Sequence, residues 1–129
     1  MYPVKKVYAY ILRYVEGEPQ LLMLRPLDNP KGLQIPEQIL KNQEDTYSTV
    51  IEVVKTKTGI DDFEMMSFVT DDVQKGDNGE IYHRFFYKII TPSWEEEGIE
   101  EEERGIYWVS RKEAISFQEG YGDYIFRIL

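Results

Sequence analysis

Apolar positions change their period along this chain, and each period predicts a different element. Segment 6–15 is rich in β-branched and aromatic residues, which favours a strand. The short apolar run at 20–25 predicts a buried central strand, and the Pro, Asp and Asn residues of 26–31 predict a loop. Beyond this loop the apolar spacing becomes helical, at Tyr47, Val50, Ile51 and Val54. We therefore predict a helix that Asp45 or Thr46 caps and that Gly59 ends.

The chain after this helix predicts a long hairpin. Segments 63–70 and 80–90 both favour strands, and the residues Gly76-Asp77-Asn78-Gly79 form a strong turn signal between them. The only histidine, His83, falls in the middle of the second strand. We expect a structural or exposed role for it, because the sequence places no acidic partner beside it.

The last third of the chain predicts a strand, a helix and a closing segment. A short strand at 105–109 leads into a helix with a capping box, in which Ser110 and Glu113 satisfy each other's backbone N–H groups. Segment 121–129 is expected to close the fold as a helix. With no internal repeat and no linker, residues 1–129 are expected to form one domain of the α/β class, with helices on both faces of a mixed sheet.

Charge and composition narrow the function. The net charge is −9, and seven of the acids are glutamates between positions 95 and 103, so the remaining surface is nearly balanced. Binding to nucleic-acid backbone through bulk charge is not expected. The chain has no Cys, which excludes disulfides, thiolate metal sites and a Cys nucleophile. We expect a cytoplasmic protein without a membrane span or a signal peptide.

One stretch has the spacing of a catalytic motif. Its matching positions are Ile35-Pro36, Glu44, Val54 and Gly59-Ile60. This spacing resembles, without a gap, the Nudix box G-x5-E-x7-R-E-U-x-E-E-x-G-U, in which U is apolar, and Trp108-Val109 followed by Glu113-Ala114 resembles the end of that domain. The resemblance implies an α/β/α sandwich with a mixed sheet. It also implies a pyrophosphohydrolase of nucleoside-diphosphate-linked substrates that uses Mg²⁺ or Mn²⁺.

The residues that carry the chemistry of the box are different here. Gln38 takes the place of the first Gly, and Glu52 takes the place of the Arg. The three acids that hold metal in the resembling enzymes are replaced by Val53, Thr56 and Lys57. This helix face carries one positive charge where those enzymes carry three negative charges, so it should repel a divalent cation. We expect no metal at Val53, Thr56 and Lys57, and no cofactor.

Three functions remain open. In the first, Lys57 replaces the metal as a phosphate-binding charge, and Thr56 and Arg25 help to bind a nucleotide or another phosphorylated small molecule without hydrolysis. In the second, Glu44 and Glu52 act as catalytic acids with one of the glutamates at 100–103, and Mg²⁺ or Mn²⁺ is then required.

In the third, the protein is an interaction domain that uses the acidic run 95–103.

The candidate residues also have purely structural interpretations, in which Glu44 flanks the helix start, Glu52 faces solvent, and Lys57 is an ordinary exposed helix residue. A homodimer is also open, because the aromatic residues of the last segment either close the core or form a dimer contact. These aromatic residues are Tyr121, Tyr124 and Phe126.

Overall fold

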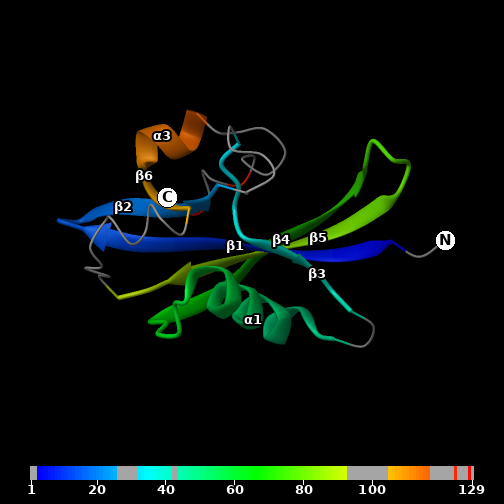
Figure 1. Cartoon of the computed structure of the whole chain (residues 1–129), viewed down its shortest axis with the longest axis horizontal. Coiled ribbons are helices and arrows are strands. Elements are labelled where there is room, and N and C mark those ends of the chain that lie inside the picture. The colour runs from blue at the N-terminus through cyan, green and yellow to red at the C-terminus, as the bar shows by residue number, and fades with distance from the viewer. Residues whose placement is uncertain are drawn as a thin grey trace.

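A six-stranded mixed sheet with a helix on each face forms the body of the protein (Figure 1). The computed structural model describes residues 3–25, 32–41, 44–92, 105–116, 124 and 128. The elements are β1 (Val4–Val15), β2 (Glu18–Leu24), β3 (Glu37–Ile39), α1 (Thr46–Thr58), β4 (Met65–Lys75), β5 (Ile81–Ile90), β6 (Ile106–Ser110) and α3 (Arg111–Ser116). The predicted fold class is confirmed.

Strand β1 is the centre of the sheet. The strand order is β4-β5-β1-β2-β6, and the β1–β5 pair is parallel while all other pairs are antiparallel. Along its other edge β1 pairs first with β3, at residues 6–8, and then with β2, at residues 12–15. Strand β3 was not predicted. It is only three residues long, and its Glu37 and Gln38 are poor strand formers.

Two apolar cores lie on opposite faces of the sheet, and the alternation of β1 divides them. Val7, Ala9 and Ile11 point to the α1 side and pack in a cluster with the helix residues Val50, Val53 and Val54. Tyr8, Tyr10 and Leu12 point to the α3 side and pack with Ala114 and Ile128. Because both faces of β1 are covered, six consecutive residues of the strand, 7–12, are buried.

Helix α1 has the predicted ends, but its buried face is rotated. Asp45 is the N-cap and accepts from the Ser48 N–H at 2.7 Å, and Gly59 follows the helix with φ 79°, a left-handed conformation that glycine adopts without strain. Tyr47, which the spacing placed on the apolar face of the helix, is 56% exposed, whereas Val53, which the spacing left out, is 1% exposed. The buried apolar stripe therefore runs through Val50, Val53 and Val54. Apolar β-branched residues occur on more than one side of this helix, so the spacing alone could not determine which side is buried.

The strand boundaries also differ from those predicted. Strand β4 runs to Lys75 instead of ending at position 70, and β1 begins two residues earlier than expected. The predicted capping box of α3 is present: Ser110 N donates to Glu113 Oε1 at 3.1 Å, and Glu113 N donates to Ser110 Oγ at 3.2 Å. Most of 121–129, where a closing helix was expected, lies outside the described residues. No described helix is long and apolar enough to cross a membrane.

Candidate functional site

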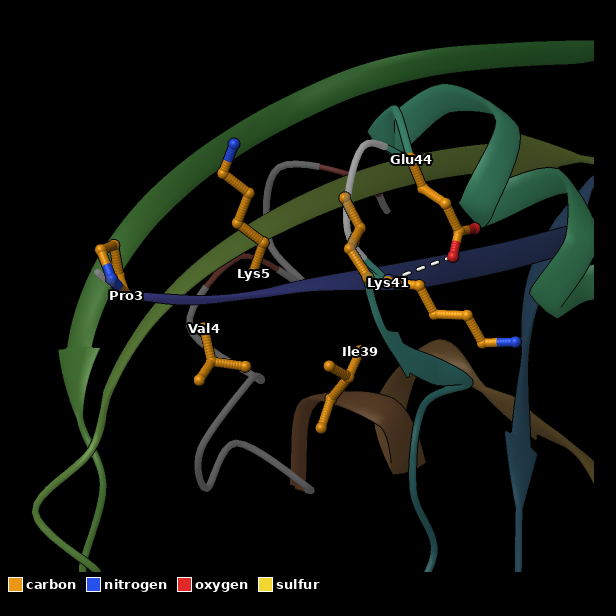
Figure 2. Close-up of a pocket in the computed structure, with 7 residues that line it drawn as sticks. Pro3, Val4, Lys5, Ile39, Lys41 and Glu44 are labelled. Atoms are coloured by element: carbon orange, nitrogen blue, oxygen red, sulfur yellow. Dashed lines mark hydrogen bonds between the residues drawn. The ribbon is translucent and has the colours of Figure 1, made fainter. Parts of the chain in front are cut away.

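Glu44, a candidate catalytic acid, holds the loop that enters α1. One of its carboxylate oxygens accepts from the Lys41 N–H at 3.1 Å (Figure 2). The other accepts from the Thr49 hydroxyl at 3.2 Å. Thr49 is buried, and its single hydroxyl proton is shared between this carboxylate and the Asp45 carbonyl oxygen. Both carboxylate oxygens of Glu44 thus connect the loop to the first turn of the helix, which agrees with the structural interpretation that Glu44 flanks the helix start.

The three box positions that would hold metal present no carboxylate. Val53 is buried in the core on the α1 side of the sheet. Thr56 is exposed, and its hydroxyl donates to the Glu52 carbonyl oxygen at 2.9 Å. Lys57 is exposed at the last turn of α1. These donors do not fit Mg²⁺ or Mn²⁺, which need several carboxylate or carbonyl oxygens. Among the described residues, no group of three or more acids and histidines is placed to hold a metal ion.

The candidate residues do not converge on one point. Thr56 and Lys57 are neighbours on α1, and Glu52 lies one turn before them with an exposed side chain. Glu44 lies just before the N-terminal end of α1, which begins at Thr46. Glu52 is six residues into the helix from Thr46, and at 1.5 Å per residue this is about 9 Å along the helix axis. Within the described part of the chain, neither Lys57 nor Glu52 forms an ion pair.

Arg25 has its own contacts at the end of β2. Its backbone N–H donates to the Gly105 carbonyl oxygen at 2.9 Å, and its guanidinium carbon lies 4.8 Å from the centre of the Tyr107 ring. This is a cation–π geometry at an exposed site. The arginine is therefore held against β6 by Tyr107, and none of its described contacts is with α1.

A cavity of about 490 Å³ opens beside Glu44, at the N-terminal end of α1 (Figure 2). Its lining comes from the start of β1, from β3 and from the loop that follows β3: Pro3, Val4, Lys5, Ile39, Leu40, Lys41 and Glu44. Figure 2 shows Val4 and Ile39 on one side of β1 and Lys5 on the other. Thr56 and Lys57, at the opposite end of α1, are not part of its lining.

A charged network that the sequence did not reveal crosses the β4–β5 pair. Arg84 is 3% exposed and forms two hydrogen bonds with the Asp72 carboxylate, at 2.8 and 2.6 Å. Tyr124 donates its hydroxyl to the same carboxylate at 2.5 Å and packs its ring on Phe86. The hydrogen bonds from Arg84, with a smaller contribution from Tyr124, lower the pKa of Asp72 despite its partial burial. This network joins the hairpin to the end of the chain.

His83 has an acidic partner that the sequence did not place beside it. Its Nε2 lies 2.7 Å from Asp71 Oδ2, and its ring stacks on Phe85 at 4.1 Å. The pair is diagonal across the strands, since Asp71 is paired with Phe85 and Val73 with His83. Asp71 fell outside the predicted strand, so no signal in the sequence placed it near His83. The acidic run 95–103 lies outside the described residues.

Comparison with known proteins identifies the fold. No protein family model and no curated protein sequence matches the chain. Among solved structures, the C. elegans Ap4A hydrolase is 15% identical with a TM-score of 0.74, over 98% of this chain and 95% of that one. The NUDIX domain of Shewanella oneidensis NrtR, complexed with ADP ribose, is 11% identical with a TM-score of 0.72, over 98% and 88%.

A third structure, described as a NUDIX hydrolase from Listeria monocytogenes, is 15% identical with a TM-score of 0.68, over 92% of this chain and 85% of that one. The chain has the Nudix fold, as the spacing of the box predicted.

Proposed function

We propose that this Nudix-fold protein binds a nucleotide-like or otherwise phosphorylated small molecule with little or no hydrolysis. The observation that carries the proposal is the state of the three metal positions of the box: a buried Val53, a Thr56 whose hydroxyl donates to the helix backbone, and an exposed Lys57. A face of this kind lacks the oxygens that a hydrolytic metal needs, and it offers one cation to a phosphate.

Lys57 is the residue on which ligand binding is proposed to depend. Its ammonium has no ion-pair partner among the described residues, so it can meet an anionic ligand without breaking an internal contact. Lys55 is in the same last turn and is also exposed. Both lysines offset the partial negative charge at the C-terminal end of the helix. Lys55 therefore supplies a matched control, since it shares this stabilising role but lies at a variable position of the box.

The first test measures ligand-induced stabilisation without metal. ADP ribose, which was bound to the NrtR domain, and Ap4A, for which the C. elegans enzyme is named, head a panel that includes nucleoside triphosphates and nucleotide sugars. A ligand that binds the folded state raises the Tm. For that ligand we expect Lys57→Gln to raise the Kd about tenfold, which is roughly 1.4 kcal/mol of lost charge-assisted bonding.

The Lys55→Gln variant should bind as the wild type does. Equal losses in the two variants would assign the effect to helix stability and not to ligand contact. Absence of any shift in Tm across the panel would contradict the proposal that the protein binds a phosphorylated ligand.

A second test separates binding from hydrolysis. Product release is followed with Mg²⁺ or Mn²⁺ present, and with EDTA as the control. We expect no turnover above the EDTA level. Metal-dependent turnover that disappears in Glu44→Gln or Glu52→Gln would overturn the non-hydrolytic proposal, and it would support an enzyme whose acids lie partly outside the usual box positions.

A further inference from the structure

Strand β4 lies at one edge of the sheet that the described residues form. This strand is at the end of the strand order, and no described strand pairs with it on the side away from β5. The inner pairing determines which residues point outward. Gly76 N donates to the Glu80 carbonyl oxygen at 2.8 Å, and hydrogen-bonded positions alternate along an antiparallel pair. Positions 74 and 72 therefore also face β5. The residues whose N–H and C=O groups face outward are Asp71, Val73 and Lys75.

The side chains of these three residues form a self-complementary pattern. Val73 is 66% exposed, the highest exposure among the large apolar residues of the described chain. Asp71 and Lys75 lie two positions to either side of it, on the same face of the strand. Two copies of this strand can pair antiparallel with Val73 of one copy opposite Val73 of the other. In this register each Asp71 lies opposite the Lys75 of the other copy. Among the described residues Lys75 has no ion-pair partner within its own chain.

We propose that two copies of this chain associate through antiparallel pairing of β4 with β4, with the two-fold axis at Val73. The pairing would form about six new backbone hydrogen bonds, two at each outward-facing pair, and would join the two sheets into one. Figure 1 shows the distal end of the β4–β5 hairpin reaching away from α1 and α3, which leaves this edge accessible among the described elements.

A bulge limits the length of this pairing. The register of β4 shifts between Phe68 and Thr70, so the regular stretch available to a partner begins after the bulge and ends at Lys75. A ladder this short buries less than the roughly 1,600 Å² of a standard interface. The dimer is therefore expected to be weak and concentration-dependent.

The absence of Cys from the sequence makes a clean cross-linking test possible. In Val73→Cys the two introduced residues face each other with Cα atoms about 5.5 Å apart, which is within the range for a disulfide. In Gln74→Cys, a matched exposed neighbour, the two positions are offset by about 8 Å, which is beyond that range. Under mild oxidation we expect a disulfide-linked dimer from Val73→Cys and little from Gln74→Cys.

Charge substitution tests the register by sedimentation equilibrium. Lys75→Glu places like charges against Asp71 of the other copy and is expected to raise the dimer Kd about tenfold. Adding Asp71→Lys in the same chain should restore the Kd to within about threefold of the wild type. Lys55→Glu makes the same change of charge on α1 and is expected to leave the Kd unchanged.

Three results would overturn this proposal. The first is a wild-type chain that stays monomeric at about 1 mM. The second is equal cross-linking of the two Cys variants. The third is a Lys75→Glu variant that behaves like Lys55→Glu. Both Cys positions are exposed, so both variants should fold, and far-UV circular dichroism checks this.

Discussion

Carboxylates restored at the three metal positions should give the chain an affinity for Mg²⁺ or Mn²⁺. The variant Val53→Glu, Thr56→Glu, Lys57→Glu places acids on one face of α1, three and four residues apart. Thr56 and Lys57 are exposed, so their replacement should change stability by no more than about 0.5 kcal/mol each. The cost is concentrated at Val53, which is 1% exposed.

The magnitude follows from this burial. Loss of a buried Val side chain costs about 1.5–3 kcal/mol. A carboxyl group in the same apolar surroundings must protonate at pH 7, and moving its pKa from about 4.3 to above 7 costs roughly 3–4 kcal/mol. The metal-free triple variant should therefore be at least about 4 kcal/mol less stable than the wild type, a large part of the 5–15 kcal/mol of a small domain. Metal at one hundred times its Kd would return about 2.7 kcal/mol.

Urea denaturation followed by tryptophan fluorescence measures both effects, with Mg²⁺ in one series and EDTA in the other. The matched control replaces the same three residues by Gln, which has a similar size and no charge, and it should show no response to metal. A folded triple-Glu variant with equal stability in Mg²⁺ and EDTA would show that the assigned register of the box is wrong. Should that variant not fold, Thr56→Glu with Lys57→Glu leaves the core intact and tests the same face.

Three further predictions concern the frame of the fold. Glu44→Ala removes two hydrogen bonds from the entry to α1 and should lower the unfolding free energy, measured in urea, by about 1–2 kcal/mol. The control Glu52→Ala, at an exposed position, should lower it by less than about 0.5 kcal/mol. Gly59→Ala forces a side chain into a left-handed conformation with φ 79° and should lower stability by about 1 kcal/mol, seen as a lower Tm. Asp72→Asn removes the carboxylate charge that the buried Arg84 faces and should cost about 3 kcal/mol at pH 7. The pKa of Asp72 is lower in the folded state, so its stabilisation of the fold is complete above the unfolded pKa near 3.8 and is lost as the pH falls through the folded pKa. The difference in unfolding free energy between wild type and Asp72→Asn should therefore shrink in acid. A difference that does not change with pH would contradict this.

The parts of the fold that depend on nearby residues could be predicted from the sequence. The cap at Asp45, the end of α1 at Gly59 and the capping box of Ser110 and Glu113 are each made within a few positions of the chain. The same holds for the turn that joins β4 to β5. The order of elements also followed from these local patterns and agreed with the resemblance that the box spacing carries, and the solved structures confirm the resulting fold.

The parts that depend on strand register could not be predicted. Asp71 and Asp72 are poor strand formers, so the predicted strand ended before them, and their partners on β5 stayed hidden. The bulge between Phe68 and Thr70 also shifts the register by a residue, which no local pattern announces. The rotation of α1 was missed for a similar reason, because only contact with the sheet decides whether Tyr47 or Val53 is buried.

The positions that match the box are those with a structural task in this protein. Glu44 bonds the entry loop to the first turn of α1, Val54 is fully buried, and Gly59 turns the chain out of the helix so that Ile60 enters the core. None of these tasks needs a metal ion. Three of the five positions that depart from the box, Val53, Thr56 and Lys57, are those whose task in the resembling enzymes is to hold the metal, and the other two are Gln38 and Glu52. These substitutions leave helix α1 and its two ends in place, because the backbone there is supported by residues that remain. This separation between support and chemistry is what a protein that binds without hydrolysis requires, and it is the physical basis of the proposed function.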